Sequence, residues 1–148
     1  MNKKIKGLFL TLSFMVASTF NVMADKDVPI TVNELPTEAQ KVLTTNFSGI
    51  KVALAKKEVD FIGRSYDVIL TNGNKLEFDK NGRWEKLSCK PGGVPQELIP
   101  SFILQFVNEH YSKERIVKIE REKGGYEVEL SNDLDLEFDK KGRCIDVD

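Results

Sequence analysis

The sequence predicts an α+β fold of two tandem units, each made of one helix followed by a four-stranded antiparallel meander. The first observation is a stretch that occurs twice, sixty positions apart. Tyr66–Leu87 and Tyr126–Val147 are identical at eleven of twenty-two aligned positions, which indicates an internal duplication. The second is that both copies alternate apolar and polar residues around turn sequences, as half-buried hairpins do. The third is an apolar stripe at helical spacing before each copy.

Residues 1–24 have the pattern of a secretory signal peptide. Lysines precede an apolar run from Leu8 to Phe20, and small residues stand before Asp25, where a signal peptidase would cut. The run is shorter than the roughly 20 apolar residues that span a bilayer. We therefore expect a periplasmic or secreted protein with no membrane span after signal cleavage.

The first unit is expected at residues 35–90, after a short polar lead-in at residues 25–34 that is extended or disordered. Pro36 suits the first position of a helix, with Glu38 in the first turn. Residues 50–59 read as a strand, and the repeated stretch then supplies a hairpin and a further strand. The helix stripe is Ala39, Val42, Leu43 and Phe47, and the inward strand residues are Tyr66, Val68, Leu70, Leu76 and Phe78.

A linker at residues 91–93 separates the second unit, at residues 94–148. Val94-Pro95 opens it as Leu35-Pro36 opens the first. Pro100 lies inside the expected helix and removes a backbone donor, so the helix either kinks at Pro100 or begins near Ile99. The helix stripe is Ile99, Phe102, Ile103, Phe106 and Val107, and the inward strand residues are Tyr126, Val128, Leu130, Leu136 and Phe138.

The charge balance excludes one class of partner. The chain has 22 Lys and Arg and 23 Asp and Glu, and the signal peptide contains three of the lysines, so the mature charge is 19 − 23 = −4. Acidic and basic residues are interspersed, without the basic patch of a nucleic-acid-binding protein. We expect no nucleic acid among the partners.

Cys89 and Cys144 are the two cysteines of the chain. Export places them where a disulfide can persist, so a bridge and two independent thiols both fit the sequence. Neither cysteine has the spacing of a redox or zinc motif.

The proline-opened helices, the Tyr-x-Val-x-Leu strands and the Phe-Asp-x-x-Gly-Arg turns resemble the PepSY-like family of exported, β-lactamase-inhibitor-like proteins. The resemblance covers nearly all of the mature chain, and it implies the helix-plus-meander units and curved sheet of the β-lactamase inhibitor protein. The sequence contains no inhibitory loop motif that could be carried over from that family. The residues that carry it are Pro36, Tyr66, Phe78, Asp79, Gly82, Arg83, Trp84, Pro95, Tyr126, Phe138, Asp139, Gly142 and Arg143, with Cys144 in place of a second tryptophan.

Strand alternation predicts which side chains of the first unit face away from the helix. Counting alternately back from an inward Leu87 places Lys86 and Trp84 on this outward face. An exposed Trp84 beside Ile69 would make a binding anchor; alternatively, Trp84 packs where the two units meet. The outward set is Asp67, Ile69, Lys75, Glu77, Trp84 and Lys86.

In the second unit the outward residues are all acidic: Glu127, Glu129, Asp135 and Glu137. Several carboxylates on neighbouring strands attract a basic partner or a cation. The alternative is a charged face that keeps the protein soluble.

No catalytic or metal-binding constellation is evident. His110, the single histidine, has no Gly-x-Ser-x-Gly nucleophile or catalytic cysteine to serve. The turns 79–82 and 139–142 lack the liganding acids of an EF-hand. The glycines of the linker are not spaced as in a phosphate-binding loop. We therefore expect a non-enzyme with no catalytic residues, metal site or cofactor.

These observations lead to the expected function: an exported, non-catalytic protein- or peptide-binding module, inhibitor-like or sensor-like, that binds a cell-envelope partner through its open sheet face. The alternative is a periplasmic carrier of a small ligand or cation on the acidic face of the second unit. A hydrolase that uses His110 or an acid ranks last.

Overall fold

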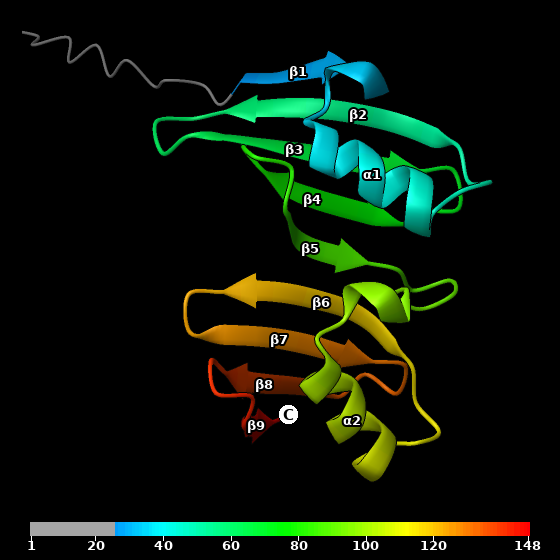
Figure 1. Ribbon diagram of the computed structural model, residues 1–148, viewed down its shortest axis with the longest axis vertical. Helices are drawn as coiled ribbons and strands as arrows, with labels where there is room; N and C mark the ends of the chain where they lie inside the picture. The colour runs from blue at the N-terminus through cyan, green and yellow to red at the C-terminus, as the bar shows by residue number, and fades with distance from the viewer. Residues whose placement is uncertain (1–25) are drawn as a thin grey trace, which may run out of the picture.

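The computed structural model describes residues 26–148, so the expected signal peptide lies outside the described residues. Nine strands form a single antiparallel sheet in chain order, and both helices cover the same face of it (Figure 1). The strands are β1 (Lys26–Ile30), β2 (Val52–Val59), β3 (Arg64–Leu70), β4 (Lys75–Asp79), β5 (Trp84–Ser88), β6 (Ile116–Glu122), β7 (Gly125–Leu130), β8 (Asp135–Asp139) and β9 (Cys144–Val147). The helices are α1 (Thr37–Asn46) and α2 (Ser101–His110), each preceded by a 3₁₀ turn, η1 (Val32–Glu34) and η2 (Gln96–Leu98).

The predicted fold class, α+β with two tandem helix-plus-four-strand units, is wrong. The described chain is mostly one nine-stranded sheet with two short helices. Two separate meanders would leave unpaired backbone groups on β5 and β6. Instead these strands pair, with Leu87 opposite Ile119. The lead-in also adds a strand, because β1 pairs with β2 from Lys26 opposite Val59 to Ile30 opposite Ala55.

Each helix begins directly after a proline. α1 follows Pro36 and α2 follows Pro100. Of the two alternatives for the second helix the latter holds, because it begins near Ile99, at Ser101, with no proline in its interior. The carbonyl of Pro100 accepts hydrogen bonds from the backbone N–H groups of Ile103 and Leu104, 3.0 and 3.2 Å away. Val94-Pro95 precedes η2 rather than α2. Proline suits these places because a first-turn N–H has no intrahelical acceptor.

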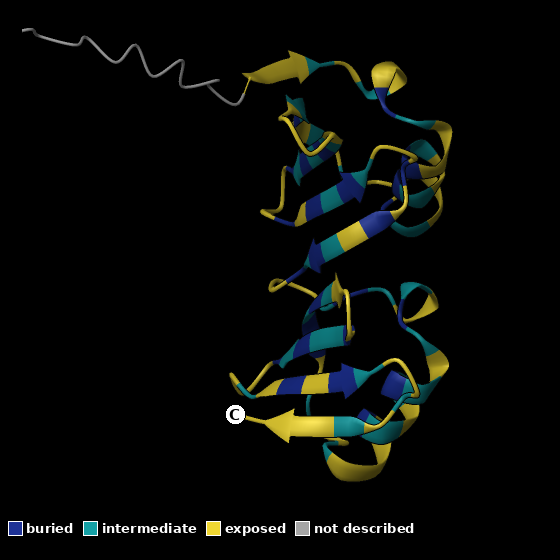
Figure 2. Cartoon of the chain, turned by 90° about the vertical axis from the view of Figure 1, so that its left-hand side faces the viewer, coloured by how far each residue is buried: buried dark blue, intermediate teal, exposed yellow. Residues whose placement is uncertain are grey.

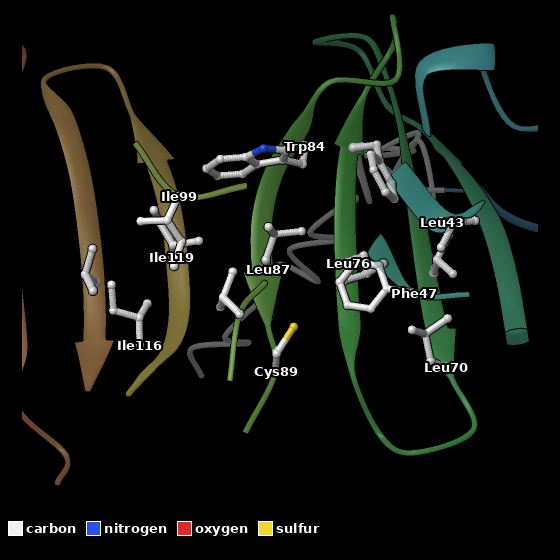
Figure 3. Close-up of a cluster of buried hydrophobic side chains, with 14 of the residues drawn as sticks. Leu43, Phe47, Leu70, Leu76, Trp84, Leu87, Cys89, Ile99, Ile116 and Ile119 are labelled. Atoms are coloured by element: carbon white, nitrogen blue, oxygen red, sulfur yellow. The ribbon is translucent and has the colours of Figure 1, made fainter. Parts of the chain in front are cut away.

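One hydrophobic core runs the length of the sheet between the strands and the two helices. At the seam between β5 and β6, Leu87 and Ile119 pack with Ile99 from the segment before α2 (Figure 3). Cys89 is buried here, and burial raises the pKa of its thiol to about 11. Cys89 and Cys144 are both free thiols. The core therefore joins the two halves of the sheet.

The repeated turns fix how the hairpins meet the helices. Oδ1 of Asp79 accepts hydrogen bonds from the backbone N–H groups of Asn81 and Arg83, at 2.8 and 3.0 Å. Gly82 has φ +83°, and a Cβ there would lie 2.8 Å from the backbone nitrogen of Ala39 in α1. Glycine thus allows both the turn and the close approach of the helix.

No helix within residues 26–148 is long and apolar enough to cross a membrane.

Candidate functional site

The face of the sheet that the helices leave uncovered is charged from one side to the other. We call it the helix-free face (Figure 2 shows the sheet edge-on). The strand registers place one charged side chain per strand in a row from β2 to β9, each opposite the next. This row is Lys56, Asp67, Glu77, Lys86, Glu120, Glu127, Glu137 and Asp146.

Between β2 and β6, lysines compensate most acids of this row. Nζ of Lys56 lies 2.6 Å from Glu58 and 3.3 Å from Asp67. Nζ of Lys86 lies 3.3 Å from Glu120. Burial raises the pKa of Glu77, and the nearby Lys86 partly offsets that rise. This part of the face is a set of paired charges.

At the β7–β9 end the carboxylates are not compensated in this way. Five of them surround a hollow of about 140 Å³, which we call the acidic hollow: Glu127, Asp135, Glu137, Asp146 and Asp148. Glu127 stands opposite Glu137, which stands opposite Asp146. Lys118 reaches Glu127 at 3.0 Å, but no ion pair within residues 26–148 involves the other four acids. Like charges directly opposite each other destabilise a sheet.

The structure places nearly all the sequence-predicted site residues on the helix-free face. Ile69, Lys75, Glu77 and Lys86 lie on β3 to β5, and Glu127, Glu129, Asp135 and Glu137 lie on β7 and β8. The structure brings three of the acids together at the hollow and pairs Glu129 with Lys90, at 2.7 Å. That these residues bind a partner stays a prediction.

The outward placement of Trp84 is wrong. A bulge between Glu77 and Phe78 shifts the register, so that Trp84 stands opposite Phe78 on the helix side of the sheet. Its side chain is 5 % exposed and its ring lies 6.5 Å from that of Tyr126. The guanidinium of Arg121 lies 4.0 Å from the centre of the indole ring. Trp84 thus packs where the two halves of the sheet meet, the second of the two interpretations of this residue.

Sequence reasoning missed several charged residues of this face. Asp146 and Asp148 complete the acidic hollow, while Lys56 and Glu120 belong to the charged row. The repeat alignment could have identified Asp146, because it aligns Asp146 with Lys86, a residue of the predicted outward face. Asp148 lies beyond the aligned stretch, and only its pairing with Asp135 brings it to the hollow.

The site has no arrangement that indicates catalysis. His110 is exposed at the end of α2, where its ring stacks on Phe106 with centroids 4.3 Å apart. Its Nδ1 lies 3.0 Å from the carbonyl oxygen of Phe106. Among residues 26–148, no three His, Cys, Asp or Glu side chains converge closely enough to hold a metal ion. The face can offer charge and hydrogen bonds to a partner.

Comparison with known proteins gives the relatives of this chain. The profile of a family described as "Putative beta-lactamase-inhibitor-like, PepSY-like" matches residues 64–146. No curated protein matches. Two solved structures of Bacteroides vulgatus are similar. A "putative periplasmic protein from DUF2874 family" is 48% identical with a TM-score of 0.81, covering 84% of this chain and 98% of its own. A "putative periplasmic protein of unknown function" is 38% identical with a TM-score of 0.78, covering 83% and 99%.

A third similar structure comes from Bacteroides thetaiotaomicron and is described as a "putative calcium-regulated periplasmic protein". It is 50% identical with a TM-score of 0.80, covering 82% of this chain and 96% of its own. The predicted location, periplasmic or secreted, is confirmed by these relatives. The family description fits an exported protein with a binding or inhibitor-like role. From the profile match and these identities, the chain belongs to the PepSY-like, β-lactamase-inhibitor-like family.

Proposed function

We propose that this protein is an exported, non-catalytic binding module, inhibitor-like or sensor-like, whose helix-free face binds a basic protein or peptide of the cell envelope. The observation that carries the proposal is the acidic hollow, where Glu137 faces an acid on either side. The folded protein holds these like charges together at a cost in stability. A cationic partner would offset that cost on binding.

The rest of the face supports the same assignment. Between β2 and β6 the ion pairs of Lys56 and Lys86 leave little net charge, so long-range attraction comes mainly from β7–β9. A field of one sign at one end of a surface steers a partner and orients it. Ile69, half-buried among the charged residues of β3, offers an apolar contact in the compensated part.

The test is affinity capture from the envelope fraction of the producing cell, read by mass spectrometry. The bait is the mature chain, compared with Glu137→Gln/Asp146→Asn. A matched control, Glu38→Gln/Glu97→Gln, removes two exposed charges from the helical side of the molecule. We expect a basic partner that the mature chain and the control retain and the hollow variant loses. Equal capture by all three baits, or no captured protein, would contradict the proposal.

A second candidate function is calcium binding at the acidic hollow. Two observations favour it: the five carboxylates around the hollow and the relative described as calcium-regulated. Ca²⁺ takes six to eight oxygen ligands in flexible geometry. The carboxylates of the hollow do not converge on one point in this structure, so binding of Ca²⁺ requires their side chains to rotate toward the ion. A bound ion would offset the same repulsion that we assign to a basic partner.

Thermal unfolding separates the two candidates. A ligand that binds only the folded state raises its melting temperature. Calcium binding predicts a rise with Ca²⁺ that magnesium at equal concentration does not give and that Glu137→Gln/Asp146→Asn abolishes. Capture of a partner in the presence of a chelator would support the peptide-binding assignment instead. An unchanged melting temperature with Ca²⁺ would rule out the calcium site.

A further inference from the structure

Four turns form one long edge of the sheet, which we call the turn edge. They are the β2–β3, β4–β5, β6–β7 and β8–β9 connections, at residues 60–63, 80–83, 123–124 and 140–143. They line up at the left of Figure 1 and face the viewer in Figure 2, where they are largely exposed. The acidic hollow is on the sheet face, so the turn edge is a separate surface.

The β2–β3 turn presents two large apolar side chains to solvent. Phe61 is 90% and Ile62 81% exposed. The turn is held by Asp60, whose Oδ1 accepts hydrogen bonds from the backbone N–H groups of Ile62 and Gly63, both at 2.8 Å. The backbone N–H of Asp60 donates to the carbonyl of Gly63 at 3.1 Å. The fold thus fixes an apolar tip at the end of a hairpin, where it finds no packing partner in the described part of the chain.

The turn edge is basic although the mature chain is acidic. Two of its arginines are held by their own turns: Arg83 pairs with Asp79, and Arg143 with Asp139. Five further cations are exposed, and no ion pair within residues 26–148 includes them: Arg64, Lys80, Lys123, Lys140 and Lys141.

Asp79 and Asp139 remain ionised, but each carboxylate is bound by backbone N–H groups and the arginine of its own turn. The backbone N–H of Arg143 is the main cause that lowers the pKa of Asp139. Asp60 in the β2–β3 turn and Glu122 at the end of β6 are in no ion pair within residues 26–148, so their charges offset those of Arg64 and Lys123. The excess positive charge of the edge therefore lies on the β4–β5 and β8–β9 turns, at Lys80, Lys140 and Lys141.

From the apolar tip and the basic edge, we propose that the turn edge docks on an anionic phospholipid bilayer, with Phe61 and Ile62 in the headgroup–acyl boundary. Apolar side chains beside cations are the pattern of peripheral binding to anionic lipids. Arg64 and Lys80 line a hollow of about 470 Å³ next to the tip, together with Asp60, and these two cations can hold a lipid phosphate there. This proposal is independent of the proposed function, because it uses no residue of the helix-free face.

The shape of the edge favours a membrane over a protein partner. Two apolar side chains on a projecting turn fit a soft interface, whereas a stable protein interface buries about 800 Å² on each partner around a packed centre. The cations in excess lie on two separate turns of one edge, which matches a charged plane better than a local acidic patch. Docked in this way, the sheet stands on its edge and leaves the helix-free face open to a partner.

The test is vesicle flotation of the mature chain with phosphatidylcholine alone or with added phosphatidylglycerol. We expect binding only to the anionic vesicles and its loss in Phe61→Ser/Ile62→Ser. Replacing Lys80, Lys140 and Lys141 by Gln should weaken binding about fivefold for each charge. The matched control Val28→Ser/Leu54→Ser changes exposed apolar residues away from this edge and should bind as the unaltered chain does.

The melting temperature of each variant shows whether it is folded. Absence of binding by the unaltered chain, or equal binding by the Phe61→Ser/Ile62→Ser variant, would overturn the proposal. Capture of an envelope protein through Phe61 and Ile62 without any vesicle binding would also overturn it, because the tip would then serve a protein.

Discussion

The two copies of the repeated stretch have the same inner face and different outer faces. We call them the first hairpin block (Tyr66–Leu87) and the second hairpin block (Tyr126–Val147). Their inward Tyr, Val, Leu, Leu and Phe are the same in both. On the outer face, Lys75 of the first block is Asp135 in the second, and Lys86 is Asp146. Packing against the helices restricts the inner residues, whereas the outer face can change its charge without changing the fold.

The blocks differ also in what lies beside them. In the first block, Trp84 packs on Tyr126 of the other half of the sheet, and β5 pairs with β6. In the second block, Cys144 stands in the position of Trp84, and β9 is the last strand of the described sheet.

The largest expected difference in stability between equivalent substitutions in the two halves is at Gly125, directly before the second block. A Cβ at this residue, with φ +151°, would lie 1.7 Å from the carbonyl oxygen of Phe138. Its counterpart is Ser65, directly before the first block, which already has a side chain. We expect Gly125→Ala to cost about 3 kcal/mol or more and Ser65→Ala to cost little, measured by urea unfolding. Equal midpoints for the two variants would contradict the close contact.

The next largest effect tests the seam. Trp84→Ala should lower the free energy of unfolding by about 3 kcal/mol, because it removes a buried ring and its contacts with Tyr126 and Arg121. Cys144→Ala, at the corresponding place in the second block, should change it by less than about 1 kcal/mol. Thermal unfolding by circular dichroism measures both. A small loss for Trp84→Ala would show that the seam does not depend on this side chain.

A smaller effect is expected from exchanging the outer charges. Asp146→Lys gives the second block the lysine of the first and should stabilise the protein by about 0.5 kcal/mol, because opposite charges would then face each other. Lys86→Asp should destabilise it by a similar amount. Added salt should reduce both changes, since partly exposed charges are screened. Shifts of the same sign in the two variants would disprove the pairing of charges.

The smallest effect concerns Glu77 and pH. Burial raises the pKa of Glu77, with Lys86 opposing, so the ionised form costs stability in the folded protein. This cost is present above the raised pKa and disappears as pH falls through it. Glu77→Gln should therefore raise the melting temperature at neutral pH, by an amount equivalent to less than about 1 kcal/mol. The gain should vanish in acid, and a gain that grows in acid would contradict the assignment.

The inner residues show what the sequence could predict. Alternation placed Phe78 and Val128 correctly, because a strand with one buried face has a period of two. It failed at Trp84, where a bulge interrupts the period. The pairing of β5 with β6 and the strand at Lys26–Ile30 depend on contacts between distant parts of the chain, which a local pattern does not encode. Three of the five acids of the hollow belong to the predicted acidic face, whereas Asp146 and Asp148 do not. Asp148 reaches the hollow only through its pairing with Asp135.

Among residues 26–148 the sheet ends at β1 on one side and at β9 on the other, and these two outer strands differ in what they present to a neighbouring strand. β1 carries Pro29, which has no N–H to offer to another strand, whereas β9 carries Asp146. The negative charge on β9 would repel the same strand of a second copy only while the acids near β9 are ionised and not bound to cations. The carboxylates that we propose to attract a partner would then also oppose pairing of the sheet with a second copy.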